Sequence, residues 1–286
     1  MIALGDYNTL RITRRSDHGL YLDGDEKVGE ILLPARFVTR AMHIGDSIEV
    51  FLYLDQEERL TATTEHPLAK VGEFAYLEVA WTNEYGAFLR WGLQKDLFCP
   101  FREQKQRMEQ GKSYIVYIKV DDESHRLMAT AKVEKYLHVP HAPAEAEPSL
   151  PLPKHGDAMS CLVWQKTDLG FKVIADGRYQ GQLYDNQIFQ PLHTGHRLTA
   201  YVDHVRHDGK IDLTLQPTGR RHTLDFAEVL LRYLYENDGR CELGDKSPAE
   251  LIYDRFKVSK KAYKKAVGDL YRRRLISITD EGIALV

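Results

Sequence analysis

The sequence has little of what disulfide-bonded, metal-binding or membrane-spanning proteins require. Its 286 residues include three cysteines, Cys99, Cys161 and Cys241, with no CxxC pair and no regularly spaced histidine partner. A disulfide framework and a structural zinc site are therefore not expected. No run of 18 apolar residues occurs, and the N-terminal segment lacks the basic and apolar regions of a signal peptide. We expect a soluble cytoplasmic protein with reduced thiols and no membrane association.

A large excess of positive charge is also absent. The formal net charge is −3, from 39 Lys and Arg against 42 Asp and Glu. Indiscriminate coating of duplex DNA is thereby disfavoured, because such binding depends on neutralising phosphates. The charge is unevenly distributed: residues 220–286 hold 14 basic and 11 acidic residues, a net +3, which leaves −6 for the rest.

Sequence signatures of enzymes are missing as well. Neither the phosphate-binding pattern GxxxxGK[ST] nor the nucleophile pattern GxSxG occurs. The acidic clusters at 23–26 and 121–123 fall in predicted turns, where acids form local hydrogen bonds. His193 and His196 have no third ligand at a suitable spacing. We expect no catalytic activity, no cofactor and no metal.

What the sequence does contain is a pattern of paired glycines that occurs three times. The spacing within each pair is 26, 25 and 25 residues, and the second glycine precedes an alternation of apolar and polar residues. Such alternation is typical of a strand with one buried face. The pairs are Gly19 and Gly45, Gly86 and Gly111, and Gly170 and Gly195. Because each unit holds only about 70 residues, the repeat predicts three small barrels in tandem.

A proline-rich segment interrupts the repeat between its second and third units. Residues 139–153 contain five of the eleven prolines and no periodic apolar face. Such a composition favours an extended spacer of about 45 Å. We therefore predict barrels at 1–66, 67–138 and 154–217, with a linker at 139–153.

The hydrophobic period changes after the third unit. Apolar residues at helical spacing predict three helices within 220–286, the second preceded by Ser247 and the third by Ser259. A short hairpin that turns at residues 280–282 should follow. This order is typical of a winged helix-turn-helix domain. The third helix is predicted to bury Tyr263, Ala266, Val267, Leu270 and Tyr271.

An aromatic pair surrounds the first glycine of the second unit. A bend or bulge at Gly86 would bring Tyr85 and Phe88 to one side of the strand. Two exposed rings there would stack unpaired bases, at about 1–3 kcal/mol per base. In the alternative interpretation, Phe88 belongs to the core and Tyr85 only to the turn.

The equivalent positions differ in the other two units. The first has His18 and Tyr21, which still carry rings, and the third has Leu169 and Lys172, so the pair is gone. Stacking is therefore predicted to be strongest in the second unit. The three tryptophans are predicted to be packing residues, with Trp91 as the candidate exception: Trp81, Trp91 and Trp164.

The second unit resembles the S1-type RNA-binding domain, through its turn Tyr85-Gly-Ala-Phe88, and the first resembles it at Gly45-Asp-Ser-Ile-Glu-Val50. This resemblance implies an OB-fold barrel of five strands that binds RNA. One departure concerns the third strand, where the S1 family usually offers a histidine. Here Leu97-Phe-Cys-Pro100 has a cysteine in that place.

Nearly the whole chain is similar to the bacterial conserved virulence factor B family. The resemblance rests on the segment 86–97, the proline-rich linker and the segment 259–275. It implies three tandem five-stranded S1-like barrels followed by a winged-helix domain, a mainly β protein with a helical C-terminus. It also implies RNA binding and an indirect role in the expression of virulence genes, without an established catalytic activity.

A basic segment in the C-terminal region completes the candidate interface. Between Arg255 and Arg274 there are nine basic residues and one acid, Asp269. On a helix, the lysines lie opposite the apolar face, where they either contact phosphates or form a merely solvated surface. The candidate RNA-binding residues are Tyr85, Phe88, Lys95, His18, Tyr21, Lys257, Lys260, Lys261, Lys264, Lys265, Arg272 and Arg273.

Together these features predict a non-enzymatic protein that binds single-stranded RNA and regulates gene expression post-transcriptionally. Bases would stack on the barrels, while the winged-helix domain would contact phosphates. A second hypothesis is a transcription factor whose winged helix reads duplex DNA. A third is an adaptor that binds components of the ribosome or of a ribonuclease complex.

Overall fold

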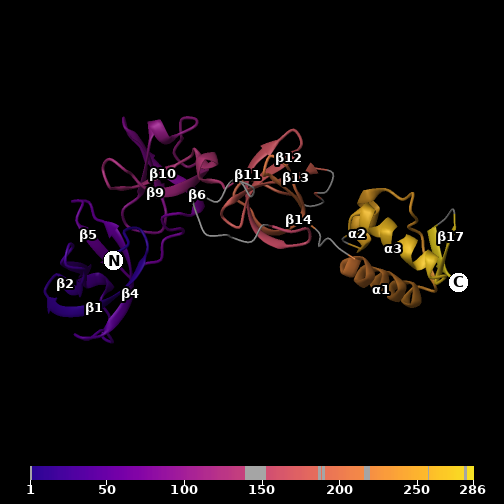
Figure 1. The fold of residues 1–286 in the computed structure, drawn as a ribbon, viewed down its shortest axis with the longest axis horizontal. Coiled ribbons are helices and arrows are strands. Elements are labelled where there is room, and N and C mark those ends of the chain that lie inside the picture. Colours follow the sequence, from indigo (N-terminus) through magenta and orange to yellow (C-terminus); the bar gives the residue numbers. More distant parts are fainter. Residues whose placement is uncertain are drawn as a thin grey trace. The chain divides into compact units, whose positions relative to one another are not determined.

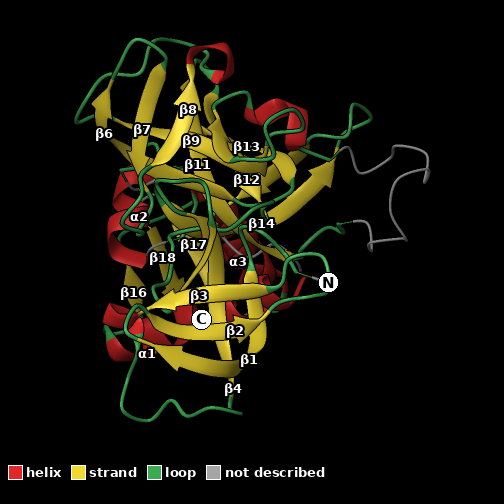
Figure 2. Cartoon of the chain, turned by 90° about the vertical axis from the view of Figure 1, so that its left-hand side faces the viewer, coloured by secondary structure: helices red, strands yellow, loops and turns green. Residues whose placement is uncertain are grey.

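The structure, a computed structural model, consists of three barrels and a small helical domain (Figure 1). It describes residues 2–138, 153–185, 188, 191–215, 220–256, 258–279 and 282–286. Each barrel is closed by five strands in the same order: first, second, third, fifth and fourth. The predicted mainly β architecture of tandem OB-fold barrels is therefore confirmed. Figure 2 shows the strands of the barrels joined by loops, turns and short 3-10 helices, and all three α-helices belong to the C-terminal domain.

Each barrel has its own run of five strands. Barrel 1 comprises β1 (Tyr7–Ser16), β2 (Gly19–Asp23), β3 (Glu30–Pro34), β4 (Ser47–Leu54) and β5 (Leu60–Thr63). Barrel 2 comprises β6 (Phe74–Thr82), β7 (Gly86–Arg90), β8 (Leu97–Pro100), β9 (Ser113–Val120) and β10 (Leu127–Thr130). Barrel 3 comprises β11 (Ala158–Thr167), β12 (Gly170–Ala175), β13 (Tyr179–Tyr184), β14 (Arg197–Val205) and β15 (Ile211–Thr214).

The first glycine of each predicted pair begins the second strand of its barrel. A Cβ atom there would lie 2.0 Å from a carbonyl oxygen of the third strand at Gly19 and Gly170, and 2.4 Å from one at Gly86. Any larger residue would force the two strands apart. The sequence repeat therefore marks the closest approach of the second and third strands in all three barrels.

Barrel 1 has a hydrophobic core of its own, and side chains of β4 also extend the core of barrel 2 across the boundary between the two barrels. Phe51 of β4 is fully buried within the core cluster of barrel 2. Its ring meets Trp91 edge-on at 5.8 Å and Tyr7 edge-on at 5.3 Å. An ion pair of 2.8 Å between Lys70 and Asp6 also joins the two barrels. The core that β4 and barrel 2 share and this ion pair join the first two barrels into one compact unit.

The C-terminal domain has the order of a winged helix. Helix α1 (Arg220–Glu236), β16 (Arg240–Cys241), α2 (Ala249–Phe256) and α3 (Lys260–Arg272) precede the hairpin of β17 (Ile276–Thr279) and β18 (Gly282–Leu285). The Ser259 hydroxyl caps α3 by accepting the backbone N–H of Ala262 at 3.2 Å. Tyr271 is 55% exposed, so its predicted burial is wrong. Tyr271 is the second-last residue of α3 and follows Leu270, the last buried residue of the helix.

Two predicted features fall outside the described residues. The linker, except for Pro153, is one, and the hairpin turn at Asp280 and Glu281 is the other. Within the described part of the chain, no helix is both long and apolar enough to cross a membrane.

Candidate nucleic-acid interface

A β-bulge in β6 determines which aromatic side chains reach the surface of barrel 2. Val79 pairs with Leu89 and Trp81 pairs with Phe88, so one extra residue lies between them. In a regular strand without the bulge, Val79 and Trp81 would share a face, because they are two positions apart and side chains alternate along a strand. Instead Val79 is buried and Trp81 points outward. The predicted bulge exists, but it lies in the partner strand rather than at Gly86.

Three rings stand side by side on the outside of barrel 2. Trp81 and Phe88 stack at 3.7 Å with an angle of 4°, and Phe88 meets Phe98 at 4.9 Å with an angle of 37°. We call Trp81, Phe88 and Phe98 the aromatic row. Because β7 lies between β6 and β8, the two neighbouring rings cover both faces of Phe88. Phe88, which is half-buried, therefore supports the row.

Trp81 presents a free ring face. Its side chain is 43% exposed, since β9 pairs with β6 only as far as Glu78 and no strand neighbour lies beyond Trp81. The indole N–H donates to the Asp96 carboxylate at 3.1 Å, which fixes the orientation of the ring. An oriented, exposed indole is a suitable surface for a planar, uncharged group.

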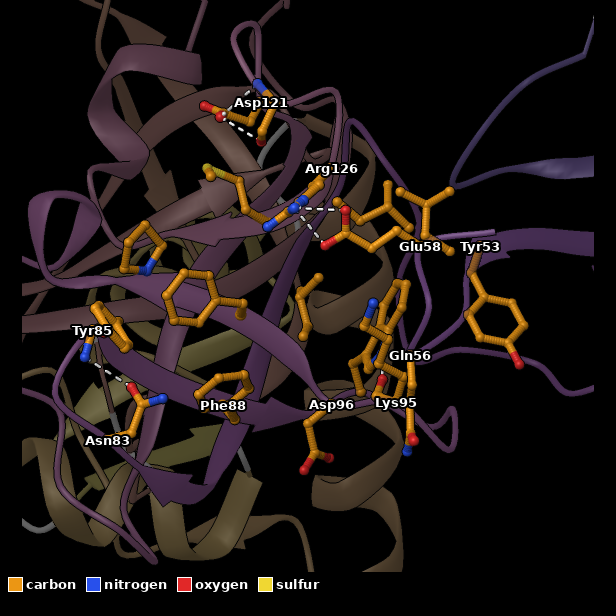
Figure 3. A pocket seen from close by; sticks show the side chains of 18 of the residues that line it. Tyr53, Gln56, Glu58, Asn83, Tyr85, Phe88, Lys95, Asp96, Asp121 and Arg126 are labelled. Carbon is orange, nitrogen blue, oxygen red and sulfur yellow. Dashed lines mark hydrogen bonds and ion pairs between the residues drawn. The ribbon is translucent and has the colours of Figure 1, made fainter. Parts of the chain in front are cut away.

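Tyr85 supplies a second exposed ring beside the row. It is 65% exposed and precedes Gly86 in the turn between β6 and β7. The Asn83 side-chain oxygen accepts the backbone N–H groups of Tyr85 and Gly86 at 2.9 and 3.1 Å, which fixes the turn. Figure 3 shows Asn83 and Tyr85 beside Phe88. Tyr85 and Phe88 line the same cleft, so the prediction that they share one side is correct.

The cleft above the aromatic row has a volume of about 890 Å³. One wall is the outer face of barrel 2, and the other includes the turn between β4 and β5 of barrel 1, with Gln56 and Glu58. Arg126 of barrel 2 pairs with Glu58 at 2.5 Å (Figure 3). Barrel 1 thus completes the site that barrel 2 begins.

Lys95, a predicted RNA-binding residue, instead joins the two barrels. Its ammonium donates to the Asp55 carbonyl oxygen at 2.6 Å. Burial lowers the pKa of Lys95. The side chain lines the cleft, but its ammonium is held by barrel 1. Sequence spacing gave no indication of this contact, because 40 residues separate the two partners.

Two of the three tryptophans pack as predicted, but the exception is Trp81 and not the candidate exception, Trp91. Trp91 is only 2% exposed and belongs to the shared core, where its indole N–H donates to the Lys95 carbonyl oxygen at 2.7 Å. Trp81, predicted to pack internally, is the exposed one. Trp164 is 7% exposed and its predicted packing role is confirmed.

The side chains of β8, the third strand of barrel 2, point alternately into the core and into the cleft. Cys99 points into the core, where burial raises the pKa of its thiol to about 12. Phe98 and Pro100 line the cleft instead. The outward position of this strand therefore adds a ring to the row.

Barrel 1 has a modified version of the same surface. Arg14 occupies the position of Trp81 and pairs with Tyr21 across the strands. Its guanidinium lies 3.5 Å from the centre of the Tyr21 ring and pairs with Glu30 at 2.7 Å. One face of Tyr21 is therefore covered, whereas His18 in the preceding turn is exposed.

Barrel 3 replaces the rings by polar groups. Gln165 pairs with Lys172 after an equivalent bulge, and Lys172 pairs with Gln182 of β13. Leu169, at the position of Tyr85, is 66% exposed. The predicted loss of the aromatic pair in the third unit is correct.

The predicted cationic face of α3 is partly neutralised. Lys264 pairs with Asp245 at 3.7 Å, and Arg272 and Arg273 pair with Asp269 at 3.8 and 3.5 Å. The predicted residue Lys257 lies outside the described residues. Of the three other predicted lysines, Lys260 donates to the Lys246 carbonyl oxygen at 3.4 Å. The other two, Lys261 and Lys265, are exposed.

The acidic clusters behave as turn-forming residues. Asp121 accepts the hydroxyl and backbone N–H of Ser124 at 2.7 and 3.2 Å, and Asp25 accepts the backbone N–H groups of Lys27 and Val28. Among the residues that the structure describes, no group of three His, Cys, Asp or Glu side chains is placed to hold a metal ion.

Two segments of the chain match families of known domains. Residues 4–65 match the S1 domain family, and residues 228–285 match the CvfB-like winged helix domain family. Both families are nucleic-acid-binding domains and neither is enzymatic.

Similar proteins extend over most of the chain. A Bacillus subtilis (strain 168) protein named uncharacterized protein YitL is 28% identical over 275 residues, covering 94% of this chain and 89% of that protein. Conserved virulence factor B of Staphylococcus aureus (strain USA300) is 22% identical over 256 residues, covering 85% and 81%. A solved multidomain protein with nucleic acid binding domains from Streptococcus pneumoniae is 22% identical, with a TM-score of 0.43 over 99% of this chain and 98% of that one. The predicted resemblance to the conserved virulence factor B family is therefore confirmed, with an S1 domain in the first barrel and a CvfB-like winged helix domain in the C-terminal region.

Proposed function

We propose that this chain is a non-enzymatic, cytoplasmic protein that binds single-stranded RNA and regulates gene expression post-transcriptionally. Unpaired bases stack in the cleft of barrels 1 and 2, on Trp81 and Tyr85. The observation that carries this proposal is the indole of Trp81, exposed on one face and held by Asp96 at 3.1 Å. Base-on-aromatic stacking contributes about 1–3 kcal/mol per base and tolerates any sequence.

In this proposal the winged-helix domain adds phosphate contacts. Lys261 and Lys265 are exposed on α3, opposite the buried stripe of the helix. Linking a weak cationic site to a weak stacking site raises the overall affinity, because the second contact forms at high effective concentration.

Fluorescence anisotropy with a labelled single-stranded RNA tests the stacking role. The double substitution Tyr85→Ala with Phe88→Ala removes one exposed ring and the support of Trp81, so the dissociation constant should rise roughly tenfold. Leu169→Ala, at the equivalent position of barrel 3, is the matched control and should change nothing. An unchanged dissociation constant in the double variant would reject stacking in this cleft.

Duplex DNA is the alternative partner, since a winged helix places one helix in a groove. The exposed groups of α3 are lysines, which suit phosphate contact better than bidentate reading of bases. A gel shift with RNA and duplex DNA at equal salt separates the two, because tight, sequence-selective duplex binding would favour a transcription factor. A ribosome or ribonuclease adaptor would instead retain its partners in a pull-down after RNase treatment.

A further inference from the structure

The charges that line the cleft do not fit a nucleic-acid backbone. Seven charged side chains line it, of which four are acidic and three basic. A site that follows a phosphate backbone is normally the reverse, with cations in excess. The acidic members are Glu58, Asp96, Asp121 and Glu123, and the basic members are Lys95, Arg102 and Arg126.

Each of the three basic side chains already has a partner. Arg126 pairs with Glu58 at 2.5 Å, and the Lys95 ammonium donates to the Asp55 carbonyl oxygen at 2.6 Å. Arg102 lies 3.2 Å from Asp121 and 3.5 Å from Glu123. A phosphate that entered the cleft would have to displace an acid from one of the two arginines or a carbonyl oxygen from Lys95. It would also enter a site whose lining side chains carry a net charge of −1.

The remaining surface of the cleft suits an uncharged planar group. The rings of Trp81, Tyr85, Phe88 and Phe98 that line the cleft are apolar, and Met128 lies next to Phe98 across the strands. These groups bind a flat ring favourably because the contact excludes water, and they offer no attraction to the negative charge of a phosphate.

We infer, on the basis of the proposed RNA binding, that this cleft admits unpaired nucleobases and leaves the sugar–phosphate backbone outside. Binding in the cleft is then insensitive to salt, since it releases no counterions. The salt-dependent part of the affinity comes from separate cations, among them Lys261 and Lys265 of α3. The ligand class of the cleft is a neutral base, as presented by a single strand or a nucleoside.

The salt dependence of RNA binding distinguishes the two contributions. For single strands, the logarithm of the binding constant falls with a slope of about 0.7 per neutralised phosphate. Trp81→Ala should therefore weaken binding roughly tenfold at every salt concentration and leave the slope unchanged. Lys261→Ala with Lys265→Ala should reduce the slope by about 1.4.

The experiment uses the full chain and a fluorescein-labelled RNA of about 16 nucleotides, titrated by anisotropy at about 50 to 200 mM KCl. Trp81→Phe keeps a ring and should restore most of the affinity. Circular dichroism of each variant, with its thermal midpoint, verifies that the barrels remain folded. The same RNA with its bases removed is the second probe, and Trp81→Ala should not weaken its binding.

The outcomes separate this inference from the proposed function. A wild-type chain that binds no RNA at any salt concentration would reject the proposed function itself. RNA binding whose slope falls in Trp81→Ala would show phosphate contact in the cleft and would overturn the inference alone. The inference also fails if Trp81→Ala weakens binding of the base-free RNA as much as that of the intact RNA.

Discussion

Barrels 2 and 3 have the same strand register, but the outward side chains are apolar in barrel 2 and polar in barrel 3. Each has a bulge in its first strand and a glycine at the start of its second, and the residues beyond them pair in the same register. In barrel 2 the outward positions of four adjacent strands are Trp81, Phe88, Phe98 and Met128. In barrel 3 they are Gln165, Lys172, Gln182 and Asp212.

The polar surface of barrel 3 has an organisation of its own. Asp212 is only 7% exposed and accepts hydrogen bonds from Arg206 at 2.8 Å and from the Tyr184 hydroxyl at 3.2 Å. His204 lies 3.3 Å from the same carboxylate. The difference teaches that the bulge and the glycine build the barrel, whereas the outward side chains determine what it binds. Three copies of one fold can therefore have three different roles.

The largest effect is expected where the shared backbone is broken. Gly86→Ala places a Cβ 2.4 Å from the Cys99 carbonyl oxygen, and separating β7 from β8 should cost about 3 kcal/mol of unfolding free energy. Gly111→Ala is the control, since its Cβ would meet nothing within 4 Å and only its φ of +76° is unfavourable, at about 1 kcal/mol. Urea unfolding followed by tryptophan fluorescence measures both, because Trp81 and Trp91 belong to barrel 2. Equal losses would show that the close approach is unimportant.

A second prediction concerns the polar surface that only barrel 3 has. Asp212→Ala removes the carboxylate that accepts hydrogen bonds from both Arg206 and Tyr184, which should destabilise barrel 3 by about 2 kcal/mol. Hydrogen exchange of β13 to β15 would report the loss locally. Asp208→Ala is the control, since its ion pair with Lys210 lies on the surface and should contribute less than about 0.5 kcal/mol. Faster exchange in barrel 2 would contradict a local role.

Much of the fold follows directly from the sequence. The glycine spacing predicts the three barrels, because the close approach of two strands admits no side chain at Gly19, Gly86 and Gly170. The helical period predicts the winged-helix domain, and Ser259 marks the start of α3. These signals are local, so a single sequence is sufficient to read them.

The candidate site is less predictable, because it depends on a bulge and on contacts between barrels. One extra residue in β6 changes which side of the sheet Trp81 faces, and no pattern in the sequence marks its position. Trp91 is near the aromatic turn in the sequence but packs on Phe51 of the other barrel. Lys95 likewise binds a carbonyl group of barrel 1. A turn signal identified Tyr85, whereas Trp81 became visible only in three dimensions.

A transfer of side chains between barrels tests whether the surface alone determines stacking. Gln165→Trp with Lys172→Phe gives barrel 3 the cross-strand pair of barrel 2, at positions of the same register. RNA affinity should rise by about fivefold, the lower end of the stacking range, because the residue at the position of Asp96 is Gln180, a neutral acceptor in place of a carboxylate. Anisotropy measures the gain. Gln165→Ala with Lys172→Ala is the control, and an equal affinity of the two double variants would contradict the prediction.

The smallest effect concerns the turn of barrel 1 that borders the cleft. Burial raises the pKa of Asp55, but hydrogen bonds from Arg59 and from the Glu57 backbone outweigh this, so the pKa lies below its usual value. The ionised carboxylate therefore stabilises the folded state above the pKa of the unfolded chain, and this stabilisation is lost as the pH falls through the lower, folded value. Asp55→Asn should cost about 1 kcal/mol of unfolding free energy at neutral pH and nothing near pH 2.

Urea midpoints of the wild type and of Asp55→Asn across this pH range would measure the convergence. Glu57→Gln, an exposed acid of the same turn, should change stability by less than about 0.5 kcal/mol at any pH. Barrel 3 has Arg206 at the equivalent position. The backbone N–H of Arg206 donates to the Lys210 carbonyl oxygen, as that of Asp55 donates to the Arg59 carbonyl oxygen. The loss of stability at low pH should therefore appear as faster hydrogen exchange in barrel 1 only. A loss of the same size in barrel 3 would mean that Asp55 is not its source.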